Sequence, residues 1–236
     1  MHYLMLGNNL FTHYQIMPNT LSNYLCKLLL VLADINEAKS LIQDFTFSQT
    51  ANNFYQCRDS HMSIAMDMII LDQWGENGVL QALENIKLEN YDSCVNIGFA
   101  GTCSPHLPLQ TCYTIDKVSL FREDSPTLCN LTEETSELTI TTIPNLLQAN
   151  LVSVRAPYRQ GFHDTLQLVD MEGYSIAKLC KHHNLRCMMI KIASDYTTKE
   201  GGDYLNQHKS VLAKKLSSAF SSSFYNIIES SIPSQI

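Results

Sequence analysis

Short apolar runs alternate with amphipathic segments along most of this chain. The runs at 28–33, 93–100 and 187–193 are largely apolar, as expected of strands buried on both faces of a sheet. Further strands are predicted within 54–71, as an edge or meander, over 112–120 and from 151. Apolar positions at helical spacing predict a helix that starts at Asp34 and others over 79–86, 171–183 and 211–224. This alternation predicts the α/β class.

We expect one domain built as a three-layer sandwich, with helices on both faces of a central mixed, mostly parallel sheet. Residues 1–26 are rich in Asn, Tyr, His and Thr without a clear period, and we interpret them as an N-terminal extension. Residues 27–236 then form the domain. The polar, acidic stretch 125–142 is expected to be a surface loop with a short helix.

Composition narrows the function classes. The chain has 236 residues, of which 45% are hydrophobic and 17% charged, so a buried core is expected and disorder is not. The net charge of −7 argues against a protein that neutralises nucleic-acid phosphates or binds a membrane through a basic patch. Neither a membrane-spanning run nor a secretory signal is expected from the pattern.

The eight cysteines are scattered, and we interpret them as reduced thiols of a cytoplasmic protein. Cys180, His182, His183 and Cys187 are the one grouping that suggests a metal site. They lack the paired C-x-x-C spacing of structural zinc, so half-buried cysteines near a polar helix end are favoured. We therefore expect no metal and no cofactor.

Polar groups follow the three apolar runs. Glu37 comes one turn after the first, Gly101 follows the second, and Asp195 follows the third. Ligands of open α/β sheets bind beyond the carboxyl ends of strands, so these positions are candidate site residues. Each also has a structural explanation: Asp34 and Glu37 match a capping box, and Asp195 could hold a turn. Residue by residue, the structural explanation is favoured.

Two segments carry a specific resemblance. The first is VNIGFAG at 95–101, and the second is VDMEGYSIA at 169–177, continuing to IASD at 192–195. Together they resemble the nucleoside phosphorylase/nucleosidase superfamily. The similar branch is the hydrolases typified by 5′-methylthioadenosine/S-adenosylhomocysteine nucleosidases and futalosine hydrolases. The resemblance covers roughly residues 28–220.

The resemblance implies a role for each matched residue. Asp195 would be the general acid at N7 of the purine leaving group, and Ser194 would orient its carboxyl. Glu172 would accept hydrogen bonds from the ribose hydroxyls, Met171 would pack against the sugar, and Glu37 would deprotonate the attacking water. We expect burial to raise the pKa of Asp195, and Glu37 to lie in a wetter environment and stay ionised.

The remaining expectations concern the lining of the site and the substrate. Gly101 would let the backbone approach the ligand, and Tyr158 lies at the end of a segment that the family uses to grip the base. The implied activity is hydrolysis of 5′-substituted adenosines (methylthioadenosine, S-adenosylhomocysteine or 6-amino-6-deoxyfutalosine, the last in menaquinone synthesis) by a homodimer. A purine or uridine phosphorylase and a non-catalytic nucleoside-binding relative remain the alternatives.

Overall fold

The structure is a computed structural model that describes residues 24–59, 62–121 and 137–232. The elements in these ranges follow in the order β1 (Cys26–Leu32), α1 (Ile35–Asp44), β2 (Ser48–Ala51), β3 (Phe54–Asp59), β4 (Ile64–Ile70), α2 (Gly75–Leu83), a 3-10 turn (Leu88–Asn90), β5 (Ser93–Thr102), β6 (Cys112–Leu120), β7 (Glu137–Thr139), β8 (Leu147–Ser153), β9 (Leu168–Asp170), α3 (Gly173–His182), β10 (Arg186–Tyr196) and α4 (Gly201–Ser231). The apolar runs are thus strands, and the amphipathic segments are helices.

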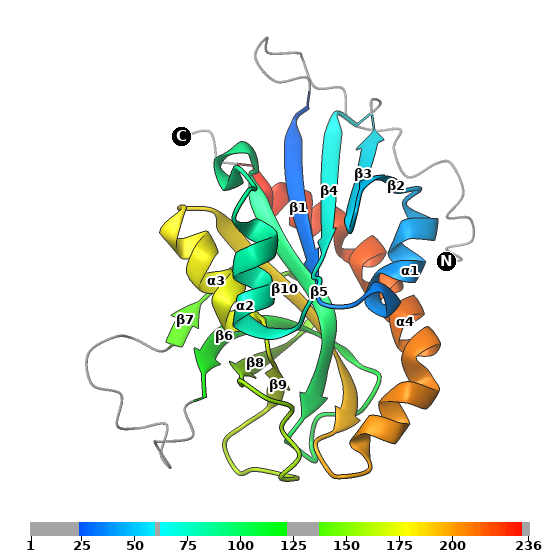
Figure 1. Cartoon of the computed structure of the whole chain (residues 1–236), viewed down its shortest axis with the longest axis vertical. Helices are drawn as coiled ribbons and strands as arrows, with labels where there is room; N and C mark the ends of the chain where they lie inside the picture. Colours follow the sequence, from blue (N-terminus) through cyan, green and yellow to red (C-terminus); the bar gives the residue numbers. More distant parts are fainter. Residues whose placement is uncertain (1–23, 60–61, 122–136, 233–236) are drawn as a thin grey trace.

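The sheet is mixed and partly closes on itself (Figure 1). β1 lies between β4 and β5 and is parallel to both. β5 also pairs with β10 and β9, and the path β10–β6–β8–β9 leads back to β5. β5 therefore belongs both to the open part of the sheet and to the closed, barrel-like part.

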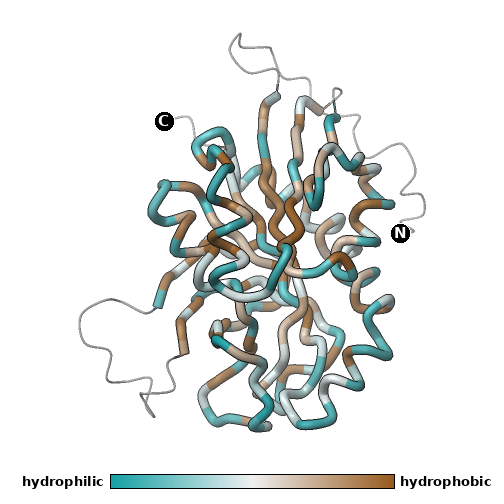
Figure 2. The backbone as a smooth tube through the Cα atoms, viewed as in Figure 1, coloured by the Kyte–Doolittle hydropathy of each residue, from teal (hydrophilic) through white to brown (hydrophobic). Residues whose placement is uncertain are grey.

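Side chains of β1 alternate between two cores, as the period of a strand dictates. Leu28, Leu30 and Leu32 pack in the core beneath α1 and α4. Leu29 and Val31 pack in the core on the other face, which α2 and α3 cover. Figure 2 shows the central strands as the most hydrophobic part of the trace and the outer turns of the helices as more polar.

The α/β class is confirmed, and the sheet geometry departs from the expected three-layer sandwich. Among the described strands, parallel and antiparallel pairings are equally frequent, so the sheet is less parallel than we expected. The closure through β6, β8 and β9 replaces a flat central layer at that end. Sequence periodicity carries no information about such long-range pairings, so it could not indicate the closure.

Two predicted segments fall largely outside the described residues. Of the extension 1–26, only the last three residues are described, and Cys26 already belongs to β1. Of the stretch 125–142, positions 125–136 lie outside the described ranges. Its remainder contains β7, which pairs antiparallel with β6. This part of the stretch is a short edge strand rather than a loop.

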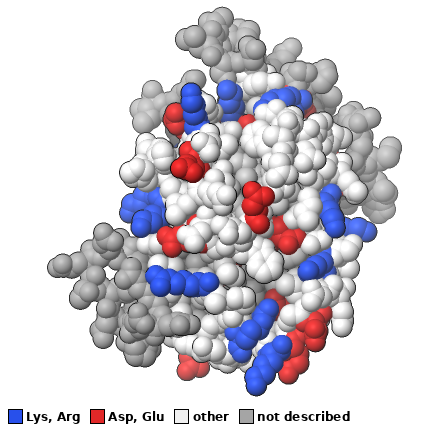
Figure 3. All heavy atoms as spheres, viewed as in Figure 1, with Lys and Arg blue, Asp and Glu red and all other residues white. Residues whose placement is uncertain are grey.

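The surface and the thiols agree with the composition. In Figure 3, acidic and basic side chains are interspersed over the face shown, without a continuous basic patch. The seven cysteines in the described ranges are free thiols.

Within the described ranges, no helix is both long and apolar enough to cross a bilayer. His, Cys, Asp and Glu side chains there also form no group of three or more that could hold a metal.

Candidate active site

Glu37 combines a helix cap with a long-range contact. Its Oε2 accepts from the backbone N–H groups of Ala33 at 2.9 Å and Asp34 at 3.2 Å, which completes the predicted capping box of α1. Its Oε1 accepts from the backbone N–H of Phe99 on β5 at 2.6 Å. A Cβ at Gly98 would lie 2.8 Å from Oε1, so any side chain at this position of β5 would displace the carboxylate.

Asp195 lies near the carboxyl end of β10, opposite Gly101 of β5. The register between these parallel strands shifts at Ser194, which is the extra residue of a bulge; bulges re-aim neighbouring side chains. Ser194 Oγ donates to Asp195 Oδ1 at 2.6 Å. Arg159 Nη1 donates to Asp195 Oδ2 at 2.8 Å and forms an ion pair with it. Both carboxyl oxygens therefore have a donor.

Glu172 lies at the start of α3 and reaches across to α2. Its Oε1 accepts from the backbone N–H of Gly75 at 2.7 Å, and its Oε2 accepts from that of Met171 at 3.3 Å. Gly75 has φ +82°, a backbone conformation that L side chains rarely adopt. The neighbouring Met171 is half-buried and packs against the small apolar cluster that contains Tyr158.

A buried lysine forms an ion pair with Asp170 and interacts electrostatically with Glu37 and Glu172. Lys191 of β10 is 2% exposed, pairs in register with Gly98, and its Nζ lies 2.8 Å from Asp170 Oδ2. Burial opposes the charge on Lys191, but the carboxylates of Asp170, Glu37 and Glu172 outweigh it and raise the pKa of the lysine. Ser153 Oγ donates to Asp170 Oδ1 at 2.6 Å and completes this network.

The seven predicted site residues lie at one end of the sheet. Glu37 contacts Phe99, and Gly101 comes two residues further, roughly 7 Å along the strand. Gly101 pairs with Asp195 on one side and with Val169 on the other. Val169 leads directly to Met171 and Glu172, and it also packs in the cluster of Tyr158. The structure therefore places these residues near the carboxyl ends of β5 and β10.

Burial sets the electrostatics of this end. It raises the pKa of Asp195, as expected, against the lowering effects of Ser194 and Arg159. Burial also raises the pKa of Glu37 to about 7, against the lowering effects of Lys191 and the Phe99 N–H. The expectation that Glu37 lies in a wetter environment than Asp195 is wrong, because their exposed fractions are 3% and 2%. The pattern missed this because the long reach of Glu37 to β5 depends on tertiary packing.

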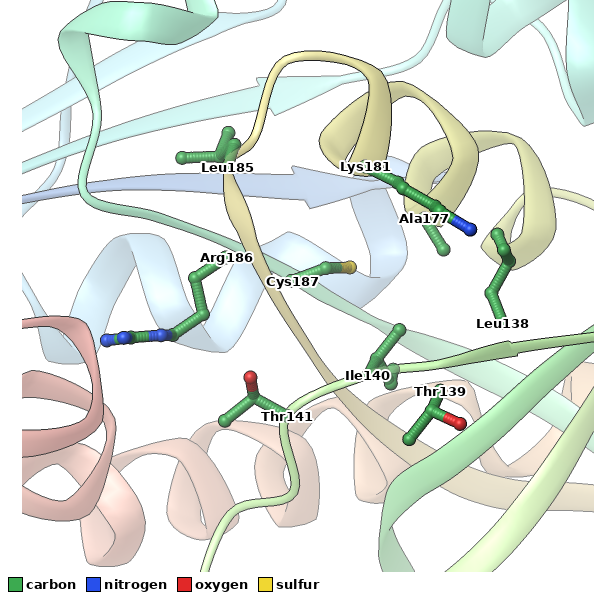
Figure 4. A pocket seen from close by; sticks show the side chains of 9 residues that line it. All are labelled: Leu138, Thr139, Ile140, Thr141, Ala177, Lys181, Leu185, Arg186 and Cys187. Carbon is green, nitrogen blue, oxygen red and sulfur yellow. The ribbon is translucent and has the colours of Figure 1, made fainter.

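A surface pocket of about 400 Å³ lies elsewhere. Figure 4 shows it between β7, α3 and the start of β10, with Cys187, Lys181 and Leu138 among its lining residues. Cys187 and Asp195 are eight residues apart on β10, which corresponds to roughly 26 Å of strand. This pocket is therefore separate from the carboxylate site.

Sequence reasoning missed three members of the site. Lys191 had a usable signal, because a lysine inside an apolar strand needs a buried partner. Asp170 directly precedes the Met-Glu pair, but nothing in the local pattern indicates that it pairs with a buried lysine. Arg159 lies in the irregular segment after β8, where spacing indicates nothing about which side chain turns inward.

Comparison with known proteins identifies the family. No family model matches the sequence, and no functionally curated protein is detectably similar to it. Among solved structures, the MTAN (5′-methylthioadenosine nucleosidase) of Chlamydia trachomatis in an Asp-to-Asn variant bound to MTA is 42% identical, with a TM-score of 0.75, over 88% of this chain and 100% of that one. The same nucleosidase bound to adenine is also 42% identical, with a TM-score of 0.74 and the same coverage of both chains.

A more distant neighbour shows how far the fold extends. A Helicobacter pylori MTAN variant with 5′-methylthioadenosine in its active site has a TM-score of 0.71 at 13% identity, over 85% of this chain and 98% of that one; this similarity concerns the fold alone. The Chlamydia matches carry the assignment, and they confirm the predicted superfamily. The chain belongs to the 5′-methylthioadenosine/S-adenosylhomocysteine nucleosidases, in the nucleoside phosphorylase/nucleosidase superfamily.

Proposed function

We propose that this protein hydrolyses the N-glycosidic bond of 5′-substituted adenosines and releases adenine. The observation that carries the proposal is that Glu37 and Asp195, 158 positions apart in the sequence, both lie against the last residues of β5: Glu37 accepts from the Phe99 N–H, and Asp195 pairs with Gly101. The Chlamydia relative, which is bound to MTA in one structure and to adenine in another, supports the substrate class.

The residue types match what the reaction demands. Cleavage develops negative charge on the departing purine and positive, oxocarbenium-like charge on the ribose. Asp195 is buried and can carry a proton to N7, with Ser194 fixing its other oxygen at 2.6 Å. Glu37 has a pKa of about 7, because of burial, and can take a proton from water near neutral pH. An ionised Glu37 can also stabilise the developing cation.

The remaining residues shape the sugar and base subsites. Glu172 accepts hydrogen bonds from the ribose hydroxyls. Its carboxylate is held in place by the backbone N–H of Gly75 at the start of α2. Met171 and Tyr158, which share one apolar cluster, pack against the nucleoside. Gly101 leaves room beside Asp195: a Cβ there would lie 2.8 Å from Thr197 Cγ2 and 3.8 Å from Asp195 Oδ2.

The experiment that tests this proposal measures adenine release from methylthioadenosine, S-adenosylhomocysteine and 6-amino-6-deoxyfutalosine side by side. Turnover of at least one, independent of phosphate, supports hydrolysis; the preferred substrate then decides between methyl-donor salvage and menaquinone synthesis. Turnover that requires phosphate would replace the proposal with a phosphorylase. Tight binding of an adenosine analogue with no turnover of any substrate would replace it with a non-catalytic nucleoside-binding protein.

The oligomeric state and the cellular compartment complete the proposal. We expect a homodimer whose partner subunit helps close the 5′ pocket, which sedimentation equilibrium tests directly. We also place the reaction in the cytoplasm, because the described cysteines are free thiols and such thiols persist in a reducing compartment.

A further inference from the structure

Arg159 forms an ion pair with the catalytic acid Asp195, and this ion pair is incompatible with proton transfer from Asp195 to the base. Its Nη1 donates to Asp195 Oδ2 at 2.8 Å, while Ser194 Oγ donates to Oδ1 at 2.6 Å. A guanidinium has five donors and no acceptor, and it cannot receive a proton from a carboxylic acid. While Arg159 remains there, Asp195 is an ionised carboxylate that accepts a hydrogen bond on each oxygen. An acid that protonates N7 must instead carry its proton on an oxygen that faces the base.

The surroundings of Arg159 allow its side chain to leave while its backbone stays. The side chain of Arg159 is 36% exposed and can turn to solvent, whereas that of Asp195 is 3% exposed, so the carboxylate left behind stays buried and favours protonation. The segment itself is anchored two residues later: the Gly161 N–H donates to Thr197 O at 2.8 Å, and Thr197 Oγ1 donates to Gly161 O at 2.8 Å. The movement needed is therefore a side-chain rotation.

We propose that Arg159 is a positioning residue that holds Asp195 ionised until the purine base displaces its guanidinium, whereupon the carboxyl takes up the proton that it delivers to N7. This inference rests on the proposed function. It couples base binding to proton uptake: the base arrives, the guanidinium turns to solvent, and one proton from water binds Asp195. The balance is one proton gained by the complex for each base bound.

Other charged or titratable groups near Asp195 come from two segments, one that follows β5 and one that precedes α4. The Cys103 thiol lies just beyond β5, and burial raises its pKa, with Asp195 adding to the effect. Lys199 and Glu200 precede α4; both are exposed, and Lys199 acts electrostatically on Glu200. Within the described ranges, Arg159 is the cation that forms an ion pair with Asp195.

The test compares Arg159→Met with Arg159→Lys and with Lys199→Met, a matched control that removes an exposed cation from the same end of the molecule. The alkaline limb of kcat/KM reports the free enzyme, and that of kcat reports the complex. For Arg159→Met we expect the kcat/KM limb to move up by about one pH unit, the low end of the effect of an adjacent opposite charge. At the optimum, kcat should change by less than about threefold. Arg159→Lys should shift less, and Lys199→Met should not shift.

Two results would overturn the proposal. If both limbs stay in place in Arg159→Met, Arg159 does not control the protonation of Asp195. If kcat and kcat/KM fall together without a shift, Arg159 acts in the complex or serves the structure alone.

A binding measurement separates this inference from the proposed function. Calorimetric titration with adenine in buffers of different ionisation enthalpy counts the protons taken up on binding. Measured at intervals from pH 5 to pH 8, uptake by the wild type should clearly exceed uptake by Arg159→Met across a window about one pH unit wide, where the free wild type is ionised and the free variant is protonated; equal uptake at every pH contradicts the inference. Failure of the wild type to release adenine from any substrate, with this difference in proton uptake intact, would overturn the proposed hydrolysis and leave the role of Arg159 standing.

Discussion

Glu37 makes the stability of this protein depend on pH in a predictable direction. Burial raises its pKa from 4.5 to about 7. At 1.36 kcal/mol per pH unit, ionising Glu37 in the folded protein costs about 3 kcal/mol more than ionising it in the unfolded chain. A carboxyl with a raised folded pKa stabilises the fold while protonated. Its contribution is fully present below pH 4.5 and is lost as the pH rises through about 7.

The informative perturbation is Glu37→Gln, which cannot ionise. The variant also disturbs the hydrogen bonds from Ala33, Asp34 and Phe99, which shifts its stability by some offset. The stability difference between protein with a protonated Glu37 and the amide variant is nearly the same at each pH. Any change of the measured difference with pH therefore reports the ionisation of Glu37. We expect the free energy of unfolding of the wild type, relative to Glu37→Gln, to fall by about 3 kcal/mol between pH 4 and pH 8.

The assay is urea denaturation followed by far-UV circular dichroism at fixed protein concentration, because association would couple stability to concentration. Fluorescence is a poor probe here, since the one tryptophan, Trp74, is 60% exposed. Glu84→Gln, at an exposed position that ends α2, is the control and should differ from wild type by less than about 0.5 kcal/mol throughout. A flat difference for Glu37→Gln, or one of opposite slope, would refute the buried-carboxyl argument.

Three further substitutions test the site. Asp195→Asn should lower turnover by roughly 10²–10⁴ through loss of acid catalysis, while calorimetry shows adenine binding within about tenfold of wild type; normal adenine release would exclude Asp195 as the acid. Gly98→Ala places a methyl group 2.8 Å from Glu37 Oε1 and should reduce kcat and lower the melting temperature together, whereas unchanged kinetics would show that the position of this carboxylate is irrelevant. Lys191→Met leaves Asp170 buried without its ion-pair partner and should cost about 3–5 kcal/mol in urea denaturation, with a smaller loss for Lys191→Arg; a variant as stable as wild type contradicts the network.

Much of the fold could be predicted because its signals are local. The apolar run at 28–33 and the Asp34–Glu37 capping pattern predicted β1 and the start of α1 correctly. Short or polar strands were missed: β2 is exposed throughout and β9 has three residues, so neither leaves a hydrophobic period. α2 begins at Gly75, four residues before the predicted start, because its first turn contains no apolar stripe.

The site was predictable where the residues match a family pattern and where that pattern places them at strand ends. The positions of Asp195, Glu172 and Gly101 follow from this. The environment of each group was less predictable, because burial is decided by elements far away in the sequence. Glu37 illustrates this: the N–H of Phe99, 62 positions later, fixes one of its oxygens. Arg159 shows the same limit for a charged partner, since no local pattern links it to Asp195.

Capping and catalysis are alternative explanations of Glu37, and the magnitudes favour catalysis. Its two oxygens divide the contacts: Oε2 caps α1, and Oε1 binds β5. A helix cap stabilises a protein by about 1 kcal/mol, whereas holding this carboxylate ionised costs about 3 kcal/mol. Capping alone does not offset that cost, and an exposed Glu would cap without it. A destabilised, half-ionised carboxyl is what a base near neutral pH requires, so we expect Glu37→Gln to lose turnover while it binds adenine. Near-normal turnover would restore the cap as the full explanation.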